Sequence, residues 1–287
     1  ATPALTPSPS ASPTPPPLPV PAASAPLFGT TWLTRHPQPA LKLPGHAAIL
    51  VDVATRQVMY ESKQNQELPT ASLAKLVTVL VALQHATLTT ELTVPAAATH
   101  LESDATEMGL TAGEQLSVGE LLDGVFLLSA NDAAETLAQA IMPRPDFIRD
   151  MNLLVRSWGL RDTLFSNPTG LDDPDEYSTA YDLAVTAWHV ESDQPSLEQI
   201  TSQKEIQLPQ TATHKAYDLH TVVGPVLHDF PGATGLKTGY TDDAGYCLAA
   251  TATRGPRSLI AIVLGSPTDI ADAEALLSYG FSVTPTG

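Results

Sequence analysis

The sequence predicts an α+β protein in which one antiparallel sheet is flanked by helices, with a helical subdomain inserted between its strands. Three observations indicate this architecture. Short β-rich runs lie at 47–53 and 57–61, amphipathic helical patterns fill the middle of the chain, and β-rich runs return after residue 204 before a closing helix. The 287 residues are enough to bury a sizeable core.

Residues 1–30 are dominated by Pro, Ala, Ser and Thr and carry hardly any charged or large apolar side chains. Such a segment cannot bury enough apolar surface to offset the entropy of ordering, so we expect an extended, disordered tail. The tail is either a tether that lets the domain reach across a cell wall or an end without a specific role. Residues 31–287 are expected to form the folded domain, with the helical subdomain at roughly 88–200.

Local patterns predict each element in turn. The runs 47–53 and 57–61 indicate a hairpin, and the apolar residues between Leu73 and Val81 form the buried stripe of a helix that begins near Ser72. Ser117 and Glu120 have the spacing of a capping box, which predicts a helix over the apolar run 121–128. We expect further helices at 132–141, 145–158, 179–190 and 269–279, and strands at 204–208, 233–237, 246–253 and 259–264.

Charge and composition exclude several classes of function. The net charge of −17 and the lack of a basic cluster argue against nucleic-acid binding. Cys247 is the only cysteine, which excludes an intramolecular disulfide, and the eight histidines lack the spacing of zinc ligands. The acidic run 172–176 lacks the pattern of a calcium-binding loop. We therefore expect no metal and no cofactor.

Ser72 and Lys75 lie three residues apart in the segment PTASLAK, residues 69–75. A serine hydroxyl is a poor nucleophile until a base removes its proton, and a neutral lysine amine can be that base. Residues i and i+3 share one face of a helix, which holds the amine of Lys75 beside the hydroxyl of Ser72. Burial and the positive end of the helix dipole both lower the pKa of this amine. The pair therefore indicates an acyl-transfer site.

Two further motifs follow in order, Ser129-Ala130-Asn131 and Lys237-Thr238-Gly239. The ordered trio resembles the signature of the penicillin-recognising serine enzymes. The longer segments LSANDAA (128–134), NPTGLD (167–172) and GLKTGYTDDAGY (235–246) resemble the serine-type D-alanyl-D-alanine carboxypeptidases, which are low-molecular-mass penicillin-binding proteins. The resemblance covers roughly residues 44–282 and implies a fold like that of penicillin-binding serine transpeptidases and β-lactamases.

The resemblance implies a catalytic role for five residues. Ser72 would be the nucleophile that attacks the peptide bond between two D-alanines, and Lys75 would be its general base. Ser129 and Lys237 would relay a proton towards the leaving D-alanine. Asn131 would bind the substrate amide and help to hold Lys75.

The same resemblance implies how the substrate is held. The backbone N–H groups of Ser72 and Tyr240 would form the oxyanion hole, which stabilises the negative oxygen of the tetrahedral intermediate. Thr238 would bind the terminal carboxylate, and Gly239 would complete this part of the substrate-binding strand.

One position departs from the family pattern. Many members carry an arginine just before the strand that follows the K-T-G strand, where it binds the substrate carboxylate; this chain has Ser258 there, with Arg257 one residue earlier. A step of one residue in a strand turns the side chain to the other face. A local bulge could restore its direction, so Arg257 is the expected carboxylate ligand and Arg254 the alternative.

The implied partners are a peptidoglycan stem peptide ending in D-alanyl-D-alanine and β-lactams as covalent inhibitors, with action in the periplasm or cell wall. No run reaches the roughly 18 to 20 apolar residues of a membrane helix, and no export signal opens the sequence as given. The nearest alternative is a D,D-endopeptidase that uses the same site. A class A β-lactamase would need an E-x-x-L-N segment, which we do not find, and a non-catalytic peptidoglycan-binding module is the alternative outside enzymes.

Overall fold

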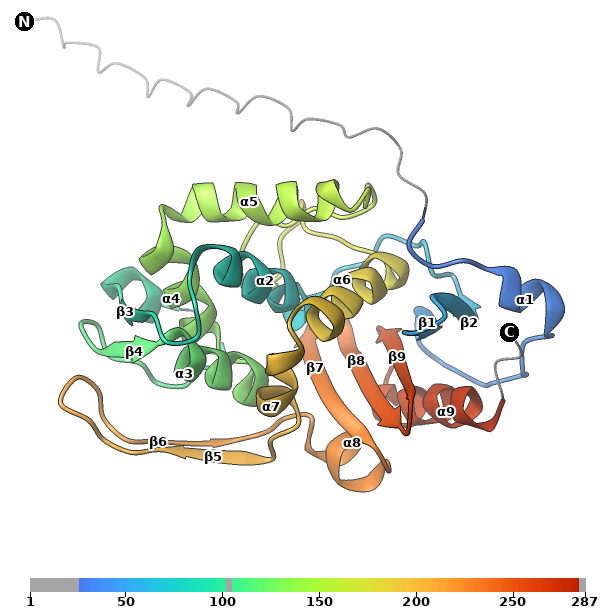
Figure 1. Ribbon diagram of the computed structural model, residues 1–287. Coiled ribbons are helices and arrows are strands. Elements are labelled where there is room, and N and C mark those ends of the chain that lie inside the picture. Colours follow the sequence, from blue (N-terminus) through green and yellow to red (C-terminus); the bar gives the residue numbers. More distant parts are fainter. Residues whose placement is uncertain (1–25, 102–104, 284–287) are drawn as a thin grey trace, which may run out of the picture.

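The computed structural model describes residues 26–101 and 105–283 (Figure 1). Its central sheet consists of β1 (Ala47–Asp52), β2 (Gln57–Ser62), β7 (Ala233–Thr241), β8 (Gly245–Arg254) and β9 (Arg257–Leu264). The strands are antiparallel and lie in the order β2-β1-β9-β8-β7. Because β1 pairs with β9, segments from both ends of the domain meet in the middle of the sheet. This confirms the predicted fold class.

The helices are α1 (Thr31–Arg35), α2 (Lys75–His85), α3 (Val118–Asp123), α4 (Asn131–Ile141), α5 (Arg144–Ser157), α6 (Ala180–Asp193), α7 (Glu198–Thr201), α8 (Gly224–Asp229) and α9 (Asp269–Ser282). Two small two-stranded antiparallel sheets pair β3 (Glu91–Thr93) with β4 (Gln115–Ser117) and β5 (Glu205–Leu208) with β6 (Tyr217–His220). In Figure 1, α2 to α5 form a helical block beside the sheet. Of these helices, α3, α4 and α5 fall within the stretch of roughly 88–200 where the inserted subdomain is expected, whereas α2 precedes it.

The sheet is buried on both faces. In β9, Ile260 and Ile262 pack into one apolar cluster together with residues of α2 and α6, whereas Leu259, Ala261 and Val263 pack into a second cluster with α9. Successive side chains of a strand point to opposite faces, so each strand needs an unbroken apolar run to fill both clusters. The result is a three-layer arrangement with helices on each side of the sheet.

Two helical segments differ from the expected ones. Ser72 lies in a short 3-10 helix, Ala71–Ala74, and α2 begins only at Lys75. The capping box of Ser117 and Glu120 is present, but the apolar run behind it is divided between α3 and a π-helical turn, Gly124–Leu128. Helices α1 and α8 and the strands β3, β4 and β6 are short, and their local patterns did not reveal them.

The expected tail is too long at its C-terminal end. Phe28 is only 1% exposed and makes an edge-to-face contact with Tyr181 of α6, with 6.0 Å between ring centroids. The backbone N–H of Gly29 donates to the carbonyl oxygen of Arg56 at 2.8 Å. The apolar area that this aromatic ring buries stabilises the ordered state of a segment whose composition alone favours disorder. Residues 26–30 thus belong to the domain, while the tail prediction for residues 1–25 lies outside the described residues.

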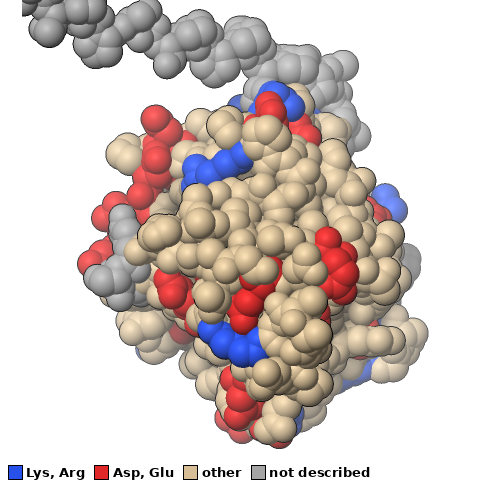
Figure 2. All heavy atoms as spheres, turned by 90° about the vertical axis from the view of Figure 1, so that its left-hand side faces the viewer, with Lys and Arg blue, Asp and Glu red and all other residues tan. Residues whose placement is uncertain are grey.

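The described surface carries more acidic than basic groups on the face that Figure 2 shows, where the red carboxylates are spread around a few blue side chains. This agrees with the net charge of −17. None of the helices within residues 26–101 and 105–283 has the length and apolar character needed to cross a membrane.

Candidate active site

Ser72 and Lys75 are in direct contact. The Nζ atom of Lys75 lies 2.7 Å from Oγ of Ser72, and the side chain of Lys75 is fully buried. Ala71, just before the serine, has a φ of +47°, which turns the chain sharply into the 3-10 helix. A non-glycine residue adopts such a backbone only where its surroundings enforce it, and such positions concentrate at functional sites.

The amine of Lys75 is adapted to act as a base. Burial lowers its pKa to about 7, against the opposing effect of nearby carboxylates, of which Glu176 is the largest contributor and Glu135 the next. Its Nζ also donates to the carbonyl oxygen of Thr169 at 2.8 Å. A base with a pKa near 7 is substantially neutral at physiological pH and can still accept a proton effectively.

A second buried lysine lies on β7. Lys237 is fully buried, and its Nζ donates to the carbonyl oxygen of Thr238 at 2.8 Å. Burial holds its pKa well below the usual value, and the positive charge of Lys75 acts in the same direction. A nearby like charge disfavours the charged form of a group, so Lys75 favours the neutral form of the Lys237 amine.

Ser129 and Asn131 are presented by the turn between the π-helical segment and α4. Ser129 ends the π-helix in the left-handed region, with a φ of +63°, and Asn131 opens α4. The backbone N–H of Asn131 donates to Thr106 at 2.7 Å, which fixes the turn. Within the described part of the chain, Oδ1 of Asn131 has no hydrogen-bond partner although the residue is only 4% exposed. A buried acceptor without a partner is costly, and a substrate N–H would satisfy it.

Two adjoining hollows open beside Ser72. One, of about 410 Å³, is also lined by Ser129, Thr238, Gly239 and Tyr240. The other, of about 340 Å³, is lined by Ser72, Asn131 and Tyr240 among others. Of the five expected catalytic residues, three thus line the cleft, while Lys75 is bonded to Ser72 and Lys237 lies beneath the surface of β7.

The rim of the larger hollow is apolar and aromatic. Among the described residues, the large hydrophobic side chains classed as exposed are Val222, Tyr240 and Tyr246, and all three line this hollow. The rings of Tyr240 and Tyr246 lie 4.6 Å apart between centroids. Exposed apolar side chains gathered at a cleft are typical of a ligand-binding surface.

Arg257 does not lie at the site, which corrects the sequence-based expectation. Its guanidinium pairs with the buried carboxylate of Asp52 at 2.8 Å and donates to the carbonyl oxygen of Gly280 at 2.6 Å. Arg257 pairs with Arg254 at the tip of the β8–β9 hairpin, whereas Thr238 pairs with Leu248, six residues back along β8. That separation is about 20 Å at 3.3 Å per residue.

Arg254 occupies the same distant end of the sheet. Its guanidinium lies over the rings of Phe230 and Phe281, 4.6 and 4.3 Å from their centroids, and its Nε donates to Pro231. Neither arginine is therefore positioned to contact a substrate at Ser72. The local shift of direction that a bulge provides could not bridge this distance.

The loop 167–171 is a part of the site to which the sequence assigned no role. It supplies the Thr169 carbonyl that contacts Lys75. Every residue has a backbone carbonyl, so the residue pattern cannot show which one contacts Lys75. The motif NPTGLD is the feature of the sequence that marks this loop. No group of three or more metal-ligating side chains occurs within the described residues.

Solved structures with the same architecture place this fold in a known class. The chain is similar to a Streptomyces K15 DD-transpeptidase mutant, with 26% identity over 85% of this chain and 100% of that one and a TM-score of 0.79. It is also similar to penicillin-binding protein D2 of Listeria monocytogenes in its cefotaxime-bound form, with 30% identity, the same two coverages and a TM-score of 0.75. The fold is that of these DD-transpeptidases and penicillin-binding proteins.

Sequence comparison narrows the class to one family. Residues 34–268 match the D-alanyl-D-alanine carboxypeptidase family, and the chain belongs to it. D-alanyl-D-alanine carboxypeptidase DacF of Bacillus subtilis is 32% identical over 82% of this chain, which spans 62% of that protein. DacB2 of Mycobacterium tuberculosis is 31% identical over 88% of this chain and 90% of its own length.

Proposed function

We propose that this chain is a serine D,D-carboxypeptidase that removes the terminal D-alanine from peptidoglycan stem peptides through an acyl-enzyme on Ser72. The observation that carries the proposal is the 2.7 Å contact between Oγ of Ser72 and the buried amine of Lys75, whose pKa is lowered to about 7. Family membership supports the substrate class.

The proposed reaction uses these groups in turn. Lys75 takes the proton of Ser72 as Oγ attacks the carbonyl carbon of the penultimate D-alanine. Backbone N–H groups of Ser72 and Tyr240 stabilise the resulting oxyanion. Collapse breaks the C–N bond, and the leaving amine of D-alanine takes a proton relayed through Ser129 and Lys237. Water then hydrolyses the ester and releases Ser72.

Substrate binding is assigned to the cleft walls. Oδ1 of Asn131, which is buried without a partner among the described residues, accepts an N–H of the stem peptide. The hydroxyl of Thr238 and the backbone of Gly239 hold the terminal carboxylate beside β7, next to the larger hollow. Because Arg257 and Arg254 lie at the far end of the sheet, this carboxylate is bound without an arginine from β8 or β9.

β-Lactams are expected to acylate the same serine, since a relative of known structure has been seen in a cefotaxime-bound form. Peptidoglycan lies outside the cytoplasmic membrane, so we infer that the chain acts in the periplasm or cell wall.

Mass spectrometry of purified muropeptides tests the proposal. After incubation with the chain, monomers ending in D-alanyl-D-alanine should lose one D-alanine, and the Ser72→Ala variant should leave them intact. Conversion of cross-linked dimers to monomers with intact termini would instead establish a D,D-endopeptidase. If neither the monomers nor the cross-linked dimers change, the alternative of a non-catalytic peptidoglycan-binding module is favoured.

A further inference from the structure

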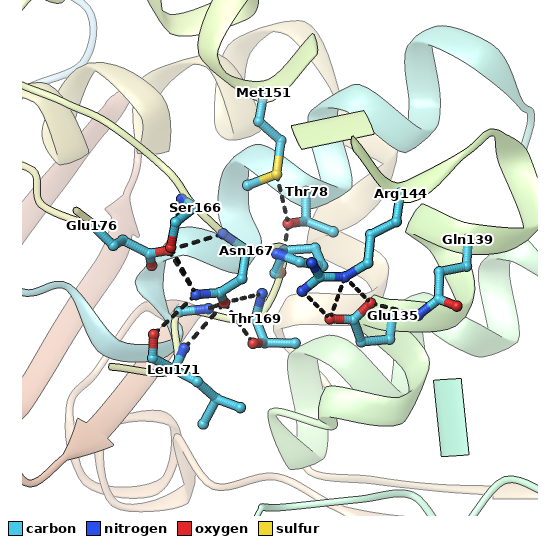
Figure 3. A network of polar contacts seen from close by, with 12 residues as sticks. Thr78, Glu135, Gln139, Arg144, Met151, Ser166, Asn167, Thr169, Leu171 and Glu176 are labelled. Carbon is cyan, nitrogen blue, oxygen red and sulfur yellow. Dashed lines mark hydrogen bonds and ion pairs between the residues drawn. The ribbon is translucent and has the colours of Figure 1, made fainter. Parts of the chain in front are cut away.

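The side chain of Asn167 organises the loop that contacts Lys75 (Figure 3). Its Oδ1 accepts from the backbone N–H of Thr169 at 3.1 Å, of Gly170 at 2.8 Å and of Leu171 at 3.2 Å, and from Oγ1 of Thr169 at 2.7 Å. Its Nδ2 donates to the carbonyl oxygen of Leu171 at 3.0 Å. A single amide thus fixes three consecutive residues of the loop.

Asn167 is itself held from outside the loop. Oε2 of Glu176, a residue that is 6% exposed, accepts from Nδ2 of Asn167 at 2.9 Å and from its backbone N–H at 3.2 Å. On the other side, Oγ1 of Thr78 donates to the carbonyl oxygen of Pro168 at 2.7 Å. Thr78 lies on α2 one turn beyond Lys75, so the loop is tied to the helix that carries the base.

The loop also packs against the backbone of the nucleophile turn. Gly170 has a φ of +79°, and a Cβ built there would lie 1.8 Å from the carbonyl oxygen of Ala71. No side chain fits between the loop and the residue that precedes Ser72. A shift of the loop would therefore change the position of the Thr169 carbonyl relative to both members of the catalytic pair.

The contact between this carbonyl and Lys75 has a chemical consequence. A neutral amine carries two N–H bonds and one lone pair, and it rotates freely unless a neighbour fixes it. When one N–H donates to the Thr169 oxygen, 2.8 Å away, the lone pair can be directed at Oγ of Ser72, 2.7 Å away. Without that acceptor the lone pair would face Ser72 only part of the time.

We propose that Asn167 is a positioning residue for acylation, which holds the Thr169 carbonyl against Lys75 so that the lone pair of the neutral amine faces Ser72. This inference rests on the proposed role of Lys75 as general base. It assigns Asn167 no contact with the substrate. Its loss should therefore slow the chemical step and leave initial binding unchanged.

The test measures acylation of the whole chain by a fluorescent penicillin under single-turnover conditions. Rapid mixing over a range of penicillin concentrations separates the constant for initial binding from the rate constant of acylation. Asn167→Ala is compared with Asn152→Ala. The side-chain amide of Asn152 likewise holds backbone, since it bonds both the N–H and the carbonyl oxygen of Phe165, but no bond of Asn152 to residues 167–171 occurs among the described residues. Asn152 is buried, whereas Asn167 is partly buried.

Asn167→Ala should reduce the rate constant of acylation by about 10-fold to 100-fold, the range expected when a reacting group is misplaced by about 1 Å. Its binding constant should stay at the wild-type value. Asn152→Ala should lower the melting temperature about as much as Asn167→Ala does, and its rate constant of acylation should match the wild-type value. Asn167→Asp retains the acceptor oxygen, and the neighbouring Glu176 carboxyl, whose pKa burial raises to about 7, can supply the missing proton. We expect this variant to recover most of the rate.

The outcomes separate this inference from the proposed function. If Ser72→Ala is acylated as fast as wild type, the proposed function fails. If acylation does require Ser72 but Asn167→Ala and Asn152→Ala have equal rate constants, the positioning role of Asn167 is wrong. Should Asn167→Ala not fold, Thr78→Val decides, because it removes the bond to Pro168 with little change in shape. An unchanged rate constant in that variant would overturn the inference.

Discussion

Gly239 of β7 lies directly against the backbone of Ser72. A Cβ built at Gly239 would be 2.8 Å from the nitrogen of Ser72 and 2.9 Å from Cβ of Ala71. Real side chains do not tolerate such separations, so the edge strand reaches the nucleophile turn only because a glycine stands there. The close approach brings β7, which carries Lys237 and Thr238, beside the serine.

The first prediction follows from this approach. Gly239→Ala should move β7 away from Ser72 and reduce the rate of acylation by penicillin about tenfold or more. Gly224→Ala is the matched control, because a Cβ there meets only side-chain atoms at 3.7 Å or beyond. Stopped-flow acylation of both variants makes the comparison, and equal rates would mean that the fit between β7 and the serine turn is not needed.

The second prediction concerns pH and the base. Lys75 must be neutral to accept a proton and its pKa is lowered to about 7, so the acylation rate should rise about tenfold per pH unit below 7 and level off above it. Lys75→Arg should lose about 10²-fold to 10⁴-fold on the plateau above pH 7 and should not show this rise with pH, since a guanidinium stays protonated. A rate that does not change between about pH 5 and pH 8 would contradict the assignment of Lys75.

The third prediction concerns Glu176, the carboxylate that most raises the pKa of Lys75. Glu176→Gln removes this charge and keeps a side-chain oxygen for the N–H groups of Ser166 and Asn167. The midpoint of the pH–rate profile should therefore move to lower pH. Asp173→Asn, an exposed change in the same segment, should leave the midpoint in place. A midpoint that moves to higher pH in Glu176→Gln would show that the electrostatic reasoning is wrong.

The fourth prediction tests the corrected position of Arg257. Removing its side chain leaves the carboxylate of Asp52, which is 2% exposed, without its ion-pair partner. Breaking a buried pair is costly, so Arg257→Ala should lower the free energy of unfolding by about 3 kcal/mol. Its acylation rate and its preference for peptides with a free terminal carboxylate should match wild type. If a stably folded Arg257→Ala variant loses that preference, Arg257 does contribute to binding the substrate carboxylate.

The sequence predicted the strands and helices that carry the motifs, because their signals are local. The capping box of Ser117 and Glu120 and the spacing of Ser72 and Lys75 each depend on residues within one turn. The continuous burial of β9 over residues 259–264 likewise follows from an apolar run that needs no knowledge of its partners.

Other features depend on relations that no local pattern contains. Arg257 is one residue from the expected position, yet the register of β8 with β9 puts it at the opposite end of the sheet from Thr238. The acceptor for Lys75 is a backbone carbonyl 94 residues away in sequence, and Phe28 is buried by contacts with a distant helix. These three relations depend on how distant segments pack together, so the structure was needed to establish them.

The most direct test of the central claim is the intact mass of the chain after exposure to penicillin. A β-lactam presents its carbonyl carbon to the same nucleophile as a D-alanyl-D-alanine end, so one covalent adduct should form on the wild-type chain. Peptide mapping should locate it on Ser72, and Ser72→Ala should show none. An adduct of undiminished yield in Ser72→Ala would contradict the assignment of the nucleophile and the mechanism built on it.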